Sequence, residues 1–191
     1  GQRRCGKSCL LRLLQDAILD HFPSGNIIYV DKEKVMFDHI RDYRDLYSHV
    51  AENTVEGPKN IVFIDEIQEI ESFEKAVRDL NGDDRYDVFI TGSNADLLSG
   101  ELATALAGRY MEINVSSLSY AEFLRFHQLE SSMDSLKKYL RFGGMPYLIN
   151  LPLESEIPYE YLKSLYKSIV LKDVVARNNQ RNIRLPQRLI L

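Results

Sequence analysis

The chain has 191 residues and a mass of 22.1 kDa, which suits one domain with room for a small second one. Hydrophobic residues make up 45% and charged residues 27%, which excludes a disordered tail. The 24 Lys and Arg residues against 28 Asp and Glu residues give a formal charge of -4, which excludes a strongly basic nucleic-acid coat as the whole function.

The apolar runs of this sequence are short. None approaches the roughly 18 residues that a membrane-spanning helix needs, and the first residues lack the basic and then apolar pattern of a secretory leader. The two cysteines, Cys5 and Cys9, are too few for a disulfide framework and indicate reduced thiols. We therefore expect a cytoplasmic protein that makes no membrane contact.

The sequence GQRRCGKS at residues 1–8 fits the phosphate-loop pattern G-x-x-x-x-G-K-[ST] at every fixed position. Gly1 and Gly6 would let backbone N–H groups surround a phosphate without a Cβ in the way. Lys7 would place a positive charge on the β- and γ-phosphates, and Ser8 offers a hydroxyl to Mg²⁺. The positive end of the helix that follows favours the same anion, so this segment predicts a nucleotide site.

Three further residues on or beside this loop, Arg4, Cys5 and Cys9, are expected to border the nucleotide. Arg4 either adds charge there or is simply solvated. Cys5 lies close to a lysine and a helix N-terminus, which favours the thiolate and predicts sensitivity to alkylation. The two cysteines alone are too few to bind a metal. A phosphate loop follows a strand, so we expect the first strand of the sheet to lie upstream of Gly1.

Helices and strands alternate along the first part of the chain. The predicted helices span 8–19, 38–50, 72–80 and 96–107, and the predicted strands span 27–30, 60–65, 87–91 and 110–115. From residue 119 onward only helices are expected, over 119–127, 133–142 and 159–177. Short apolar strands between helices are typical of a parallel sheet covered on both faces. We therefore predict an α/β core over 1–117 and a helical lid over 118–191 that leads into a further C-terminal domain.

A pair of carboxylates follows the second predicted strand. Four apolar residues are succeeded by Asp65 and Glu66, at the carboxyl edge where open α/β sheets bind ligands. Asp65 could hold Mg²⁺, and Glu66 could take a proton from the water that attacks the γ-phosphate. A surface salt bridge is the alternative for Glu66. A general base for water favours hydrolysis over phosphoryl transfer to a metabolite.

The third predicted strand ends in Thr91-Gly92-Ser93-Asn94, which brings hydroxyl and amide groups to the same edge. Ser93 and Asn94 are both candidates for the residue that orients the attacking water. Ordinary turn and helix-cap chemistry is the alternative for both.

Several blocks of this sequence together resemble the bacterial and archaeal AAA-type ATP-binding proteins that pair an ATPase core with a C-terminal domain of unknown function. The blocks are GQRRCGKSCLLRLL, IVFIDEIQEIESFEKAVRDL, VFITGSNADLLSGELATALAGRY, SSLSYAEFLRF and YLRFGGMPYLI. The resemblance implies a P-loop NTPase sheet of order 5-1-4-3-2, with ATP and Mg²⁺ as ligands. It assigns Lys7 and Ser8 to phosphate and metal, Asp65 and Glu66 to the acidic pair, and Ser93 or Asn94 to the water-orienting position.

The same resemblance suggests Arg109 as a charge that reaches a nucleotide in cis or from a neighbouring subunit, with a structural ion pair as the alternative. A homo-oligomer would follow from the second arrangement.

A cluster of basic residues near the C-terminus could contact DNA or a protein partner, although a solvated face is the simpler interpretation. The cluster comprises Lys172, Arg177, Arg181, Arg184 and Arg188.

Two functions remain in competition on these grounds. The first is a Mg²⁺-dependent ATP hydrolase whose cycle moves the helical lid and the domain attached to it. The second is a nucleotide-gated binding or scaffold module with little turnover. Glu66 favours the first, because a general base is needed only for hydrolysis.

Overall fold

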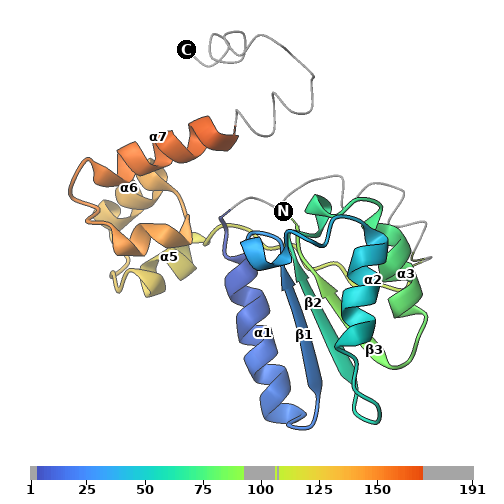
Figure 1. The fold of residues 1–191 in the computed structure, drawn as a ribbon. Coiled ribbons are helices and arrows are strands. Elements are labelled where there is room, and N and C mark those ends of the chain that lie inside the picture. The colour runs from blue at the N-terminus through green and yellow to red at the C-terminus, as the bar shows by residue number, and fades with distance from the viewer. Residues whose placement is uncertain (1–3, 93–105, 107, 170–191) are drawn as a thin grey trace, which may run out of the picture. The chain divides into compact units, whose positions relative to one another are not determined.

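The computed structural model describes residues 4–92, 106 and 108–169 (Figure 1). These residues fall into two compact units, one of residues 6–116 and one of residues 117–169, with residues 4 and 5 grouped with the second. Within the described ranges, no helix is both long enough and apolar enough to cross a membrane.

The first unit is built on a parallel sheet of three strands in the order β1-β2-β3. They are β1 (Asn26–Asp31), β2 (Asn60–Asp65) and β3 (Tyr86–Ile90). Every residue of β2 is buried, because this strand has a neighbour on each side and helices on both faces. The predicted α/β fold with a parallel sheet flanked by helices is confirmed, and the order of these strands matches the 4-3-2 part of the predicted sheet.

Helix α1 (Lys7–His21) covers one face of this sheet (Figure 1). Side chains alternate between the two faces of a strand, so Ile61 and Phe63 point to α1, where they pack with the buried Leu11. The predicted amphipathic helix over 8–19 is therefore correct. The exposed side of this helix nonetheless includes an apolar residue, since Leu10 is 44% exposed.

Helices α2 (Tyr43–Glu52) and α3 (Phe73–Asn81) cover the opposite face (Figure 1). Their buried residues join those of the strands that point to this face in the main core of the unit. That core includes Val30, Leu46, Val50, Val62, Ile64, Val77 and Leu80. A 3₁₀ turn over Val35–Phe37 precedes α2.

The start of α2 differs from the prediction of a helix over 38–50. Asp42 is the N-cap residue, and its carboxylate accepts hydrogen bonds from the N–H groups of Arg44 and Asp45 at 2.8 and 3.1 Å. The Asp45 side chain bonds back to the N–H of Asp42, which completes a capping box. These reciprocal bonds satisfy N–H groups that would otherwise lack partners, so the helix begins at Tyr43.

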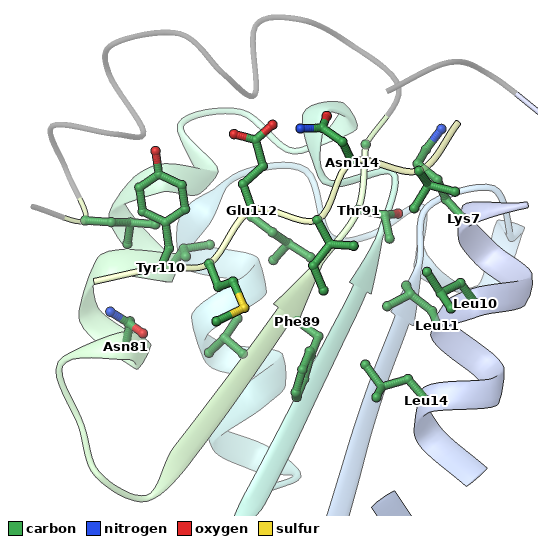
Figure 2. A pocket seen from close by; sticks show the side chains of 18 of the residues that line it. Lys7, Leu10, Leu11, Leu14, Asn81, Phe89, Thr91, Tyr110, Glu112 and Asn114 are labelled. Carbon is green, nitrogen blue, oxygen red and sulfur yellow. The ribbon is translucent and has the colours of Figure 1, made fainter. Parts of the chain in front are cut away.

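The predicted strand over 110–115 is wrong, because these residues form no ladder with another described strand. They line a cavity of about 290 Å³ whose other walls include the β3 residues Val88 and Ile90 and the α1 residue Leu14 (Figure 2). No residue of β2 borders it, so the cavity lies along the edge of β3 that faces away from β2. A strand needs a neighbour for its backbone groups, and the described residues supply none here.

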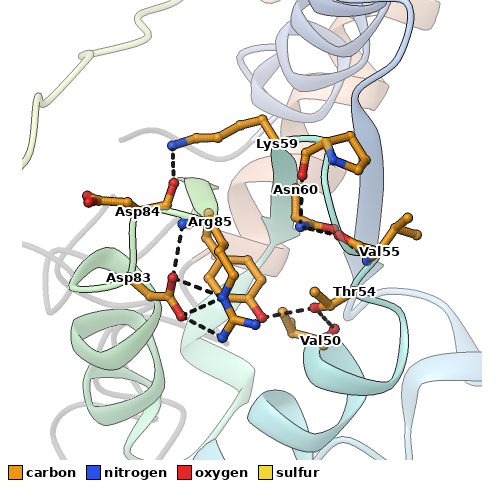
Figure 3. A network of polar contacts seen from close by, with 10 residues as sticks. Val50, Thr54, Val55, Lys59, Asn60, Asp83, Asp84 and Arg85 are labelled. Carbon is orange, nitrogen blue, oxygen red and sulfur yellow. Dashed lines mark hydrogen bonds and ion pairs between the residues drawn. The ribbon is translucent and has the colours of Figure 1, made fainter.

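At the edge where the strands begin, a buried amide ties the loops together (Figure 3). Asn60 is 1% exposed, and its Oδ1 accepts hydrogen bonds from Val55 N and from Asn26 Nδ2 at 2.9 and 2.8 Å. Beside it, Thr54 Oγ1 lies 2.8 Å from the carbonyl of Val50 and 2.9 Å from the hydroxyl of Tyr86. This edge is thus held by structural hydrogen bonds, and the chemistry-bearing side chains lie at the other edge.

The described part of the second unit is helical. It comprises α5 (Tyr120–Phe126), α6 (Met133–Phe142), a 3₁₀ helix (Pro146–Asn150) and α7 (Ile157–Ile169). Its core gathers Phe142, Met145, Leu148 and Leu165. Residues 170–177 of the helix predicted over 159–177 lie outside the described residues, and so do the residues of the helix predicted over 96–107 except for Leu106.

The turn after α6 approaches the start of this unit closely. The N–H of Leu118 donates to the carbonyl of Gly144 at 2.7 Å, and the hydroxyl of Tyr139 donates to the carbonyl of Leu118 at 3.0 Å. A Cβ at Gly144 would lie 2.0 Å from the carbonyl oxygen of Leu118. Only glycine fits here, which explains part of the Gly-Gly-Met-Pro sequence.

Candidate functional site

The start of α1 has the features of an anion site. Gly6 precedes the helix with a φ of +103°, a left-handed conformation that favours glycine. The first helical hydrogen bond is Leu10 N to Gly6 O at 2.9 Å, so the N–H groups of Lys7, Ser8 and Cys9 precede the helical ladder. The first turn contains no acidic residue. The helix dipole and these N–H groups therefore favour an anion.

The carboxyl edge of the sheet brings Asp65 and Thr91 together. Phe63 and Phe89 stack across β2 and β3 with ring centroids 5.0 Å apart, and two residues later Asp65 and Thr91 follow on the same face. The hydroxyl of Thr91 donates a hydrogen bond to Oδ1 of Asp65. Asp65 is only 2% exposed, so its carboxylate is held in a fixed position at the end of the strand.

Glu66 begins the turn that leaves β2. Its φ of +53° is a left-handed conformation that is uncommon for a residue with a side chain. Its N–H donates to the Thr91 hydroxyl at 3.3 Å, and its carboxylate accepts a hydrogen bond from Nε2 of Gln68. The side chain is half-buried. Glu66 is therefore positioned both through its backbone and through its carboxylate.

A second carboxylate, Asp31, lies next to Asp65 as its register partner at the end of β1. Asp31 is 5% exposed; its Oδ1 accepts a hydrogen bond from Glu33 N at 3.0 Å, and Lys34 Nζ lies 3.6 Å from its Oδ2. Asp31 was not among the predicted site residues, although it ends an apolar strand just as Asp65 does. Its contacts show that it organises the turn after β1.

The environment at this edge of the sheet affects the pKa of Tyr29. This residue precedes Asp31 by two positions and lies on the same face of the strand. Burial raises the pKa of Tyr29, and the nearby charges of Asp65 and then Asp31 raise it further, while Arg12 opposes them. Burial, and after it the two neighbouring carboxyl groups, thus raise the pKa of Tyr29 and favour the neutral phenol. An added cation would offset the effect of the carboxyl groups.

The cavity along β3 is lined both by the start of α1 and by the end of β3 (Figure 2). Its lining includes Lys7 from the start of α1 and Thr91 from the end of β3, together with Asn114. Since Thr91 also hydrogen-bonds Asp65, a single residue links the phosphate-loop lysine to the acidic pair.

Arg109 borders the same cavity, but at the part of it that lies next to Asn81 of α3. Its carbonyl accepts a hydrogen bond from Asn81 Nδ2 at 3.3 Å, at the end of α3 that leads into β3. Figure 2 shows Asn81 and Tyr110 well away from Lys7 and Thr91. The structure therefore brings Lys7, Asp65 and Glu66 to one edge of the sheet and does not bring the backbone of Arg109 there.

The remaining predicted residues divide into three groups. Arg4 is exposed and has a φ of +60°. Cys5 is buried and Cys9 is exposed, and neither forms a disulfide bond within the described part of the chain. Gly1, Ser93 and Asn94 lie outside the described residues. Thr91 was not among the predicted site residues, although the hydroxyl and amide groups after this strand were predicted to reach the site through Ser93 or Asn94.

The Asp65 carboxylate and the Ser8 hydroxyl are oxygen donors of the kind that Mg²⁺ prefers. Mg²⁺ commonly takes one or two protein ligands, while phosphate oxygens and water complete its six positions. The helix N-terminus at Lys7 supplies the matching place for phosphate.

Comparison with known proteins identifies the family of this chain. The family model described as "AAA domain" matches residues 1–124. An uncharacterized protein of Haemophilus influenzae is 37% identical over 199 residues, which cover 100% of this chain and 49% of that protein. An uncharacterized protein of Methanocaldococcus jannaschii is 33% identical over 197 residues, which cover 96% of this chain and 43% of that protein. The chain thus spans about half the length of these relatives.

A solved structure is similar in fold. The crystal structure of Cdc6p from Pyrobaculum aerophilum superimposes with a TM-score of 0.54 at 14% sequence identity, over 96% of this chain and 56% of that one. At this identity the similarity concerns the fold alone.

Proposed function

Because the chain belongs to the AAA domain family of P-loop ATPases, we propose that it binds ATP with Mg²⁺ and hydrolyses the γ-phosphate. One observation supports this most: Thr91 borders the cavity that Lys7 also lines, and it hydrogen-bonds Asp65. The residues for phosphate, metal and water activation are thereby joined at one edge of the sheet.

The phosphate-binding half is formed by the start of α1. The left-handed conformation of Gly6 turns the chain into the helix, and the N–H groups of the first helical turn lie ahead of the first helical hydrogen bond. Lys7 adds a positive charge beside them. Ser8 and Asp65 are the proposed ligands of Mg²⁺, which when bound neutralises charge on the phosphates. Arg4, Cys5 and Cys9 border the loop and have no assigned chemical step.

Glu66 is the proposed general base. Its carboxylate would accept a proton from a water molecule as that water attacks the γ-phosphate. The hydrogen bond from Gln68 holds this carboxylate, and the bond from the Glu66 N–H to Thr91 holds its backbone. A base held in this way loses little orientational freedom on reaching the reactive geometry.

Arg109 is exposed, and its main chain lies beside the end of α3. This position favours the arrangement in which Arg109 reaches the nucleotide of a neighbouring subunit. The proposal therefore includes a homo-oligomer. The rate of phosphate release per subunit should fall when the protein is diluted. Arg109→Ala and Glu66→Gln subunits, each inactive alone, should regain phosphate release when they are mixed.

The decisive experiment compares Glu66→Gln with a matched control in the same turn. Glu69 is an exposed glutamate three residues later, so Glu69→Gln removes an equal charge away from the proposed reaction. Glu66→Gln should lower phosphate release by about 100-fold or more while ATP binding persists. Glu69→Gln should behave as the wild type. ATP and GTP are to be tested in parallel, with and without Mg²⁺.

The second candidate function is a nucleotide-gated binding module with little turnover. It predicts ATP binding together with equally slow phosphate release in the wild type and in Glu66→Gln. The hydrogen bond that Gln68 makes to the Glu66 carboxylate is compatible with such a resting state. Equal rates in the two proteins would therefore decide for the binding module.

The helical second unit is the proposed responder to the nucleotide. In this proposal, contacts with the γ-phosphate favour one arrangement of residues 118–191, and hydrolysis removes those contacts. The resulting change of arrangement acts on an attached domain and on a DNA or protein partner. Hydrogen exchange of α5, α6 and α7 should differ between the ATP and ADP states. Identical exchange in both states would argue against the coupling.

A further inference from the structure

We propose that Thr91 is the positioning residue of the acidic pair: its hydroxyl sets the orientation of the Asp65 carboxylate and of the Glu66 backbone at the same time. The proposal rests on the proposed function of this site, which it deepens. It assigns a role to a residue whose neighbours Ser93 and Asn94 were the expected participants.

Four hydrogen bonds join Thr91 to the segment that contains the acidic pair. Two come from its backbone: its N–H donates to Ile64 O at 2.9 Å, and its carbonyl accepts from Ile67 N at 3.0 Å. Two come from its hydroxyl, which donates to Asp65 Oδ1 and accepts from Glu66 N at 3.3 Å. The backbone bonds fix where the turn lies, and the hydroxyl bonds fix how the two acidic residues are oriented.

The hydroxyl has a specific task at each residue. On Asp65 it occupies one carboxylate oxygen, and thereby sets the rotation of the group that is to bind the cation. On Glu66 it satisfies the N–H of a residue whose φ of +53° is a strained backbone conformation for a residue with a side chain. Since a displacement of about 1 Å can cost on the order of 100-fold in rate, this orientation matters for catalysis.

The two kinds of hydrogen bond can be separated by mutation. Thr91→Val removes the hydroxyl and keeps the backbone bonds and the approximate volume. Thr91→Ser keeps the hydroxyl and removes a methyl group. Thr54 provides a matched control at the other edge of the sheet, because it is also half-buried and its hydroxyl also contacts two oxygen atoms, Val50 O and Tyr86 Oη (Figure 3). Thr54→Val therefore reports the general cost of losing such a hydroxyl.

The measurements on the full-length protein are kcat and KM for ATP, the Mg²⁺ concentration at half-maximal rate, and binding of a fluorescent ATP analogue with EDTA or Mn²⁺. Thr91→Val should lower kcat and weaken Mn²⁺-dependent binding by about 10–100-fold, as is typical when the support of a metal ligand is removed. Binding in EDTA should stay as in the wild type. Thr91→Ser and Thr54→Val should retain both the rate and the Mn²⁺ dependence.

Equal losses in Thr91→Val and Thr54→Val would overturn the proposal, because they would show only a general effect on the fold. Wild-type metal dependence in Thr91→Val, or a loss in Thr91→Ser as large as in Thr91→Val, would overturn it too. If the wild type binds ATP but does not hydrolyse it, the proposed hydrolase fails and Mn²⁺-dependent binding still decides the role of Thr91. Thermal denaturation of each variant establishes that it is folded.

Discussion

Asp31 and Asp65 are register partners at the ends of two parallel strands, and both are almost fully buried, at 5% and 2% exposure. Two carboxylates on adjacent strands repel each other where water cannot screen them well. The hydroxyl of Thr91 and the ammonium of Lys34 partly offset this repulsion. The arrangement explains why a cation would be favoured at this edge of the sheet.

Tyr29 should report the charge at this edge. Its pKa is raised by burial and by the charges of Asp65 and Asp31, so Asp65→Asn should lower it while burial still keeps it above the ordinary value. NMR titration of ¹³Cζ-labelled tyrosine would measure the shift, with Tyr29→Phe to assign the resonance. Mg²⁺ with a nucleotide should act in the same direction. An unchanged Tyr29 pKa in Asp65→Asn would contradict this electrostatic account.

His49 should make the first unit sensitive to acid. Burial lowers its pKa, and the neighbouring His39 lowers it further. The unfolded chain therefore takes up the proton first, at about pH 6.5, so stability is complete above that pH and falls as the pH drops toward the folded pKa. His49→Gln should reduce this loss in denaturant titrations between about pH 7.5 and 5.5.

The exposed His21 provides the control for that experiment. His21→Gln should leave the acid-induced loss unchanged. His127 in the second unit also has a pKa lowered by burial, so a part of the loss should persist in His49→Gln. An identical pH dependence in the wild type and in His49→Gln would refute the assignment.

Gly144→Ala should destabilise the helical unit. The new Cβ would lie 2.0 Å from Leu118 O and 2.9 Å from Leu118 N, so the bond between these two backbones must break or move. We expect a cost of about 3 kcal/mol, at the upper end of overpacking. Hydrogen exchange of α5 and α6 would measure it. Gly82→Ala, whose nearest contacts would be 3.4 Å, should change stability by less than about 1 kcal/mol.

Cys9 should be the reactive thiol, in place of the predicted Cys5. Cys9 is exposed in the first turn of α1 and is therefore accessible to a reagent, whereas Cys5 is buried. A maleimide should modify Cys9 first, as followed by mass spectrometry, and Cys9→Ser should abolish this fast modification. Saturating ATP should slow it if the loop binds phosphate. Faster labelling of Cys5 would contradict the structure.

Local patterns in the sequence were sufficient for most elements. The bounds predicted for the second buried strand, 60–65, and for the helix over 133–142 agree with β2 and α6, because apolar periodicity and flanking cap residues act within one turn or strand. The phosphate loop and the Asp65–Glu66 pair were also recognisable, since each is a contiguous pattern of residue types.

Only the tertiary structure decided features that depend on distant partners. Residues 110–115 have the composition of a strand and yet form none, because a strand is defined by its neighbour. The bond between Thr91 and Asp65 joins residues 26 apart in the sequence, and the pairing of Asp31 with Asp65 depends on register between strands. The sequence by itself determined which chemical groups reach the carboxyl edge of the sheet. Which of them touch was decided by the packing of the strands, because hydrogen bonds act only over about 3 Å.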